Sequence, residues 1–173
     1  MGKIPYAIAI LGMAGGILIA ILFGVNENLF KNKIKDGLSR NDKIQSIADP
    51  ADKQAKIQNE VSKNWRYYQR FHFHSTGIGA MSLALLVFLA FVGAPRRAKL
   101  TAAYLTSLGG FLYPFIWLFA AIYGPEMGRH EAKETFAFFG YMGGVFLIGT
   151  LLILILSFRY PLHLQLAAES INA

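Results

Sequence analysis

The chain contains no cysteine, and its long apolar stretches contain no aspartate, glutamate, lysine or arginine. The lack of cysteine excludes disulfides, cysteine-ligated zinc, iron–sulfur clusters and covalently attached c-type haem within this chain. The lack of charge in the apolar stretches argues against an ion pump or ion-coupled transporter acting alone, because such proteins carry ionisable residues at membrane depth. The sequence also has no phosphate-binding glycine loop and no metallohydrolase motif. We therefore expect no catalysis by this chain on its own.

Charged residues make up only 16% of the 173 residues, whereas hydrophobic residues make up 54%. The hydrophobic residues gather in four uncharged stretches, at about residues 4–25, 71–93, 100–123 and 136–158. Each stretch is long enough to cross a hydrocarbon core of roughly 30 Å as a helix that rises about 1.5 Å per residue. Helices are expected because backbone polar groups cannot stay unpaired in lipid. The predicted fold is all-α, an integral membrane four-helix bundle that forms one domain over residues 1–173.

The first stretch follows a short basic start, as a secretory signal would. It is longer than a typical signal core, and no A-x-A-like site follows Phe23, so we expect an anchor that is kept. The formal net charge is +7, but the basic residues flank the apolar stretches. Attraction to anionic lipid headgroups explains this charge more simply than nucleic acid does.

A polar segment over residues 26–70 separates the first two stretches and forms the long extramembrane part of the chain. Phe30, Ile34 and Leu38 recur every four residues among lysines. This spacing predicts an amphipathic helix that lies on the membrane surface.

Asp49 and Pro50 then have the form of a helix start, with Asp49 as the N-cap and Pro50 in the first turn. No stop signal follows until Gly93. We expect one long helix from about Pro50 to Val92, whose first part stands outside the bilayer and whose Trp65 lies at headgroup level.

Small residues mark all four stretches. Gly12 with Gly16, and Gly140 with Gly144, form two G-x-x-x-G patterns. Glycines at this spacing let helix backbones approach closely. The pattern predicts a tight bundle or a contact with a partner subunit.

Two histidines open the second stretch, in the segment Phe71-His72-Phe73-His74. Histidine is the usual nitrogen ligand of haem and copper. Helical residues two apart point about 200° apart, so the pair is not expected to bind one metal together. His130, between the third and fourth stretches, lies on the same side of the membrane by topology. One hypothesis is a b-type haem held by His72 or His74 and by His130.

The third stretch contains Tyr113-Pro114 and Trp117. A proline kink with aromatic packing is the first interpretation. Tyr113 and Trp117 are also candidates for lining an apolar pocket that binds a quinone or a lipid.

A purely structural role competes with both ligand hypotheses. Arginines and aromatic residues surround His72 and His74, as in an ordinary interfacial belt, and histidines there bond to headgroups, water or a neighbouring loop. The charges that precede the fourth stretch are either a docking surface or a solvated loop; they are Glu126, Arg129, Glu131, Lys133 and Glu134.

The His72-Phe73-His74…Gly77 helix start resembles the H-x-H helix openings of several small bacterial membrane proteins. This resemblance covers about ten residues. It implies haem binding or association with respiratory oxidases and reductases, in a bacterial cytoplasmic membrane.

Our expectation from the sequence is a small membrane subunit of a larger respiratory or electron-transfer complex, with a structural or assembly role. Its partners would be other membrane subunits and lipids, and not nucleic acid. The alternatives are an electron-transfer subunit with haem b, and a quinone- or lipid-binding subunit.

Overall fold

The computed structural model describes residues 2–163, and this part of the chain is helical without strands. The helices are α1 (Ile4–Ser39), α2 (Asp42–Gln45), α3 (Pro50–Phe91), α4 (Arg96–Leu112), α5 (Phe115–Met127), α6 (Arg129–Thr135) and α7 (Ala137–Arg159). Four helical segments are long and apolar enough to cross a membrane: α1, α3, α4 with α5, and α7. The predicted all-α fold with four membrane helices is confirmed.

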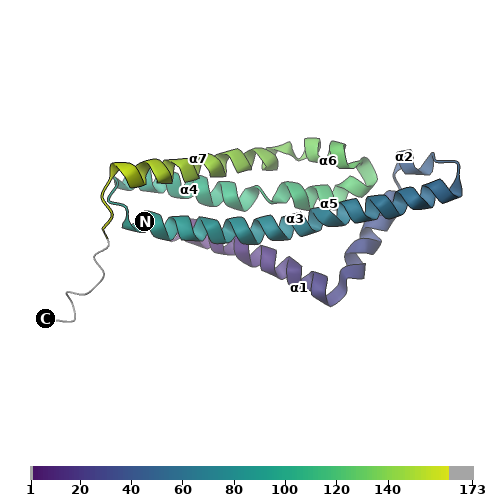
Figure 1. Cartoon of the computed structure of the whole chain (residues 1–173), viewed down its shortest axis with the longest axis horizontal. Helices are drawn as coiled ribbons and strands as arrows, with labels where there is room; N and C mark the ends of the chain where they lie inside the picture. The colour runs from purple at the N-terminus through teal and green to yellow at the C-terminus, as the bar shows by residue number, and fades with distance from the viewer. Residues whose placement is uncertain (1, 164–173) are drawn as a thin grey trace.

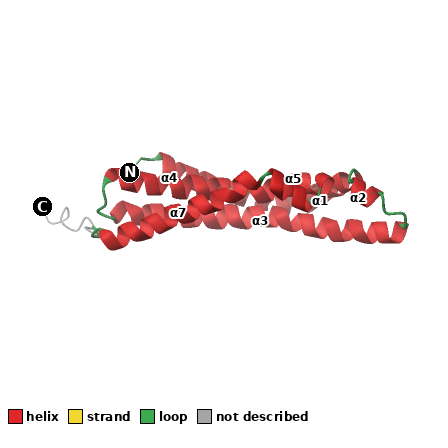
Figure 2. Ribbon diagram, turned by 90° about the horizontal axis from the view of Figure 1, so that it is seen from above, coloured by secondary structure: helices red, strands yellow, loops and turns green. Residues whose placement is uncertain are grey.

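The molecule is elongated along the direction of these helices (Figure 1). The N-terminus, the turn between α3 and α4, and the end of α7 lie at one end, and α2 and α6 lie toward the other. Figure 2 shows that α3 continues past the remaining helices at the α2 end. The polar segment and the α5–α6 connection therefore lie at the same end of the molecule, as the order of the four spans predicted.

The long helix α3 begins and ends almost where the sequence predicted. The Asp49 carboxylate accepts hydrogen bonds from the backbone N–H groups of Ala51 and Asp52, at 2.7 and 2.9 Å. At the other end, the Lys99 ammonium donates to the carbonyls of Ala90 and Val92, which have no partner inside the helix.

Helix α1 consists of two straight parts joined by a kink at Asn26, whose backbone is extended (φ −155°, ψ 83°). The Asn26 side chain accepts a hydrogen bond from Leu29 N–H and so caps the second part. The second part carries the amphipathic stripe, but the stripe faces protein: Ile34 and Leu38 are 1% and 2% exposed. The predicted helix exists, and its apolar face packs on α3 and α5 instead of lying on lipid.

A break at Tyr113-Pro114 divides the third membrane segment into α4 and α5. Proline has no N–H to donate, and its ring clashes with the carbonyl four residues earlier, so the helix cannot continue unbroken. The predicted kink is present.

The membrane half, in which α1 packs on α3 and α4 packs on α7, depends on glycine contacts. A Cβ atom at Gly79 would lie 2.6 Å from the backbone nitrogen of Met13 in α1. A Cβ atom at Gly149 would lie 2.5 Å from the backbone nitrogen of Thr106 in α4. Of the predicted G-x-x-x-G pair in α7, a Cβ atom at Gly140 would lie 2.9 Å from the Ile116 side chain, whereas one at Gly144 would meet nothing within 4 Å.

At the other end, residues 27–68 and 120–135 form a second packing unit, which we call the polar lobe. It has its own apolar core, to which α1, α2, α3, α5 and α6 contribute; the buried members are Ile34, Leu38, Ile44, Val61, Tyr67, Tyr68, Ala120, Ala121 and Ala132. This core fixes the lobe to the end of the bundle.

Candidate functional site

His72 lies between α3 and α1, partly buried. Its Nδ1 is 2.8 Å from the carbonyl oxygen of Gly16. Because a carbonyl only accepts, Nδ1 carries the proton and donates it. The space around this ring is small, since a Cβ atom at Gly16 would meet the Thr76 side chain and, at 3.0 Å, the His72 carbonyl. His72 therefore joins two helices, together with Ser75, whose hydroxyl donates to the Gly12 carbonyl at 2.7 Å.

His74 faces away from α1, toward α4 and α5, as the spacing predicted. Its Nδ1 lies 2.8 Å from the Arg70 carbonyl, one turn earlier in the same helix, so this ring too is protonated at Nδ1. The ring centroid is 5.5 Å from that of Tyr113 and 5.8 Å from that of Trp117. With Nδ1 as the donor, a lone pair on Nε2 is the form in which this imidazole would bind a metal.

Tyr113 and Trp117 lie where the α4–α5 break directs them, against α3. The Arg70 guanidinium lies over the Trp117 ring, 4.8 Å from its centroid, and over Tyr67 at 5.6 Å. The indole Nε1 of Trp117 is buried and has no hydrogen-bond partner within residues 2–163. The structure thus brings together three of the residues singled out in the sequence, His74, Tyr113 and Trp117, and adds Arg70.

His130 is not brought to the other two histidines. It is exposed on α6, and its Nε2 lies 3.2 Å from the Glu134 carboxylate. Its neighbour Arg129 contacts Glu60, with Nε 2.9 Å from the carboxylate. Glu60 precedes His72 by twelve residues of α3, which is about 18 Å of helix. Nor does the described part of the chain contain a group of three or more His, Asp or Glu residues placed to hold a metal ion.

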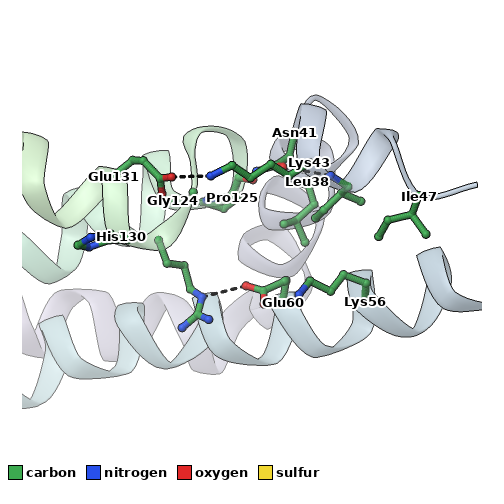
Figure 3. Close-up of a pocket in the computed structure, with 13 residues that line it drawn as sticks. Leu38, Asn41, Lys43, Ile47, Lys56, Glu60, Gly124, Pro125, His130 and Glu131 are labelled. Carbon is green, nitrogen blue, oxygen red and sulfur yellow. Dashed lines mark hydrogen bonds and ion pairs between the residues drawn. The ribbon is translucent and has the colours of Figure 1, made fainter.

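The polar lobe contains a cavity of about 440 Å³ between the end of α1, α2, α3 and the α5–α6 connection (Figure 3). Its lining combines apolar Leu38, Ile44 and Pro125 with charged and ionisable side chains, which are those of Lys43, Lys56, Glu60, Arg129, His130 and Glu131. Glycine is required at the α5–α6 connection, since Gly128 has a φ of 103°.

Ion pairs join the segments around this cavity. The Lys43 ammonium lies 2.6 Å from the Glu131 carboxylate (Figure 3), and Arg40 lies 2.9 Å from Glu126. The hydrogen bond from Lys43 lowers the pKa of Glu131 below its ordinary value. The α6 charges are thus partly used inside the protein, where they hold α6 against α2 and α3, so they are not simply a solvated loop.

Asn41 is the residue that sequence reasoning missed. It is 7% exposed, and its side-chain nitrogen donates to the carbonyls of Pro125 and Glu126 at 3.0 and 2.8 Å. Its oxygen accepts from Ile44 N–H and caps α2. The pattern Asn41-Asp42 signals a helix start in the sequence, but nothing there indicates the contact with α5.

No family model, curated protein or solved structure matches the chain. Its function has to be inferred from this geometry.

Proposed function

We propose that this protein is a non-catalytic membrane subunit that holds a partner subunit through its polar lobe. The observation that carries the proposal is the way the lobe is built: one helix projects from a base that is tied to the membrane bundle on several sides. The proposed setting is a respiratory or electron-transfer complex of a bacterial cytoplasmic membrane, which rests on the H-x-H resemblance.

The base of the lobe supports a holding role because side-chain contacts join its segments to one another. Asn41 joins the end of α1 to the end of α5, Arg129 joins α6 to α3, and Lys43 joins α2 to α6. A partner bound to such a base is held in a fixed position relative to the membrane.

The projecting part is the start of α3, which extends past the other helices (Figure 2). Most of residues 50–59 are exposed. The end of a helix frays where few side chains pack on it, so a partner that covers this segment would stabilise it. Its exposed polar side chains lie on several faces, and they include Gln54, Lys56 and Gln58.

Site-specific photo-crosslinking in native membranes tests this. A photoreactive residue at Gln54 or Gln58 should give one discrete adduct, whereas one at Tyr141 or Phe158, exposed on α7 at the level of the bilayer, should give only lipid adducts. The adduct mass should equal that of a polypeptide that co-purifies in mild detergent. A monomeric protein with no adduct at either lobe position overturns the proposal.

A second candidate function is haem binding at His74, whose Nδ1 is held by a carbonyl and whose Nε2 has no hydrogen-bond partner within residues 2–163. Because His130 is far away, the opposite axial ligand would come from a partner subunit, or the iron would be five-coordinate. An absorption spectrum of the complex, purified in mild detergent, tests this idea. A Soret band that His74→Ala removes and His72→Ala keeps supports it, and a colourless preparation overturns it.

A further inference from the structure

A second cavity, of about 250 Å³, lies inside the bend of α1. Its lining comes from both parts of α1, from α3 and from α5; the residues are Ile19, Leu29, Phe30, Lys33, Tyr68, Leu118, Ala121 and Ile122. It is smaller than the roughly 300–1,000 Å³ of typical ligand and cofactor sites. A whole haem or dinucleotide therefore does not fit, but a part of an amphiphile does.

The kink at Asn26 creates this cavity. Before the kink α1 runs along the bundle, and after it the helix turns back toward α2 (Figure 1). Phe23, Phe30, Trp65 and Tyr68 fill one side of the bend, with ring centroids 4.8–6.4 Å apart. Toward α5 the bend stays open, where Leu29 and Ile122 are about half exposed, at 52% and 47%.

The lining of this cavity combines apolar residues of a predicted span with a lysine of the polar segment. Ile19 belongs to the uncharged first span, whereas Lys33 follows the kink in the lysine-rich second part of α1. In a membrane we therefore expect one end of the cavity to meet hydrocarbon and the other end to meet the headgroup layer.

Two polar groups at this cavity have no partner among the described residues. The Lys33 ammonium is exposed and forms no ion pair within residues 2–163. The Tyr68 side chain is 4% exposed, and its hydroxyl forms no side-chain hydrogen bond within that range. A cation and a hydroxyl donor above an apolar cavity complement an anionic headgroup that carries a hydrocarbon chain.

We propose that this cavity binds one anionic phospholipid, with its phosphate at Lys33 and Tyr68 and part of an acyl chain between Leu29, Leu118 and Ile122. The kinked segment of α1 would then hold a lipid against α3 and α5. This site is independent of the partner surface at the start of α3.

Native mass spectrometry of the delipidated protein with added phosphatidylglycerol or phosphatidylcholine tests the proposal. Phosphatidylglycerol should bind at one site, with at least about tenfold preference over phosphatidylcholine. This ratio corresponds to a difference of about 1.4 kcal/mol in binding free energy. Lys33→Gln should lower this binding by about fivefold and abolish most of the preference. Leu29→Trp, which fills the cavity from an exposed position, should reduce binding of both lipids.

Matched controls are available on the same helix. Lys35→Gln removes an exposed lysine that does not line the cavity, and Val25→Trp adds bulk at a position that is 78% exposed and outside it; both should leave binding unchanged. Glycerol phosphate separates a free anion from a lipid, because it lacks the chain and should not bind at lipid concentrations. Three results would each overturn the proposal. The first is equal binding of the two lipids, and the second is an equal loss of binding in Lys33→Gln and Lys35→Gln. The third is tighter binding of a short-chain quinone than of phosphatidylglycerol.

Discussion

The membrane half and the polar lobe are held together by different contacts. In the membrane half, glycines let backbones touch, and hydroxyl and imidazole groups of α3 donate to carbonyls of α1. In the lobe, ion pairs and a buried asparagine join segments that share an apolar core. Lipid offers no hydrophobic driving force between helices, so close packing carries the contact there. The part of the lobe that lies outside the predicted spans gains from burying apolar area away from water.

This difference implies that the two halves fail in different ways. A larger side chain at a contact glycine should destabilise the membrane half, because the backbone atoms that it meets cannot move aside as a flexible side chain does. Loss of polar partners, or a change of pH, should damage the lobe. Substitutions that affect only one half test this difference.

The largest effect is expected from Gly79→Ala in α3. The new methyl group would lie 2.6 Å from the Met13 nitrogen and 2.9 Å from its Cα, so α1 and α3 must separate. Overpacking of this kind costs roughly 1–3 kcal/mol. Thermal unfolding in detergent measures it. Gly77→Ala, in the same helix but with nothing within 4 Å, is the control and should be neutral or slightly stabilising. Equal effects of the two substitutions would refute the backbone contact.

Asn41→Ala should open the lobe while the membrane half stays intact. It leaves the carbonyls of Pro125 and Glu126 without their donor in a buried position, at a cost of roughly 1–3 kcal/mol. Faster amide exchange should appear in α2 and α6 and be absent from α4 and α7. Asn32→Ala, at an exposed position of α1, should change nothing. Exchange that rises evenly over all helices would show that the lobe is not a separate unit.

A smaller loss is expected from Asp49→Ala, which removes the N-cap of α3. Losing a cap of this type costs about 1 kcal/mol. Because the cap lies at the projecting end of the helix, fraying should be confined to the first turns of α3 and be visible as proteolysis there. Asp36→Ala, in an exposed position inside α1, is the control. If Asp49→Ala allowed proteolysis in α1 as fast as in the first turns of α3, this account would be contradicted.

The sequence predicted the fold well where one physical rule dominates. Uncharged stretches of span length leave helix as the main solution, and Asp49-Pro50 and Tyr113-Pro114 act through local backbone chemistry that needs no tertiary information. The same rules place His72 and His74 on different faces of α3. These features follow from periodicity and from single residues.

What the sequence did not reveal depends on contacts between distant segments. The stripe of Phe30, Ile34 and Leu38 fits a membrane surface as well as it fits a protein surface, because periodicity shows an apolar face without showing what covers it. The separation of His130 from His72 likewise follows from how far α3 extends beside α6, which topology alone does not give. The kink at Asn26 was not predicted, although asparagine is a preferred N-cap residue. The cavity inside the bend depends on contacts with α3 and α5, which no single residue indicates.

The smallest expected effect is the pH response of the Lys43–Glu131 pair in the lobe. The pKa of Glu131 is lowered in the folded protein, chiefly by the hydrogen bond from Lys43. A carboxyl with a lowered pKa adds stability above its unfolded pKa and loses it as the pH falls through the folded one. The melting temperature of the wild type should therefore exceed that of Glu131→Gln near neutral pH, and the gap should close in acid. Both groups are largely exposed, so this difference in melting temperature should be small and shrink in salt.

The difference in melting temperature between the wild type and Gly79→Ala is the control. It should persist at every pH, because the backbone contact involves no titrating group. If it also closed in acid, the two halves would not be held by different contacts.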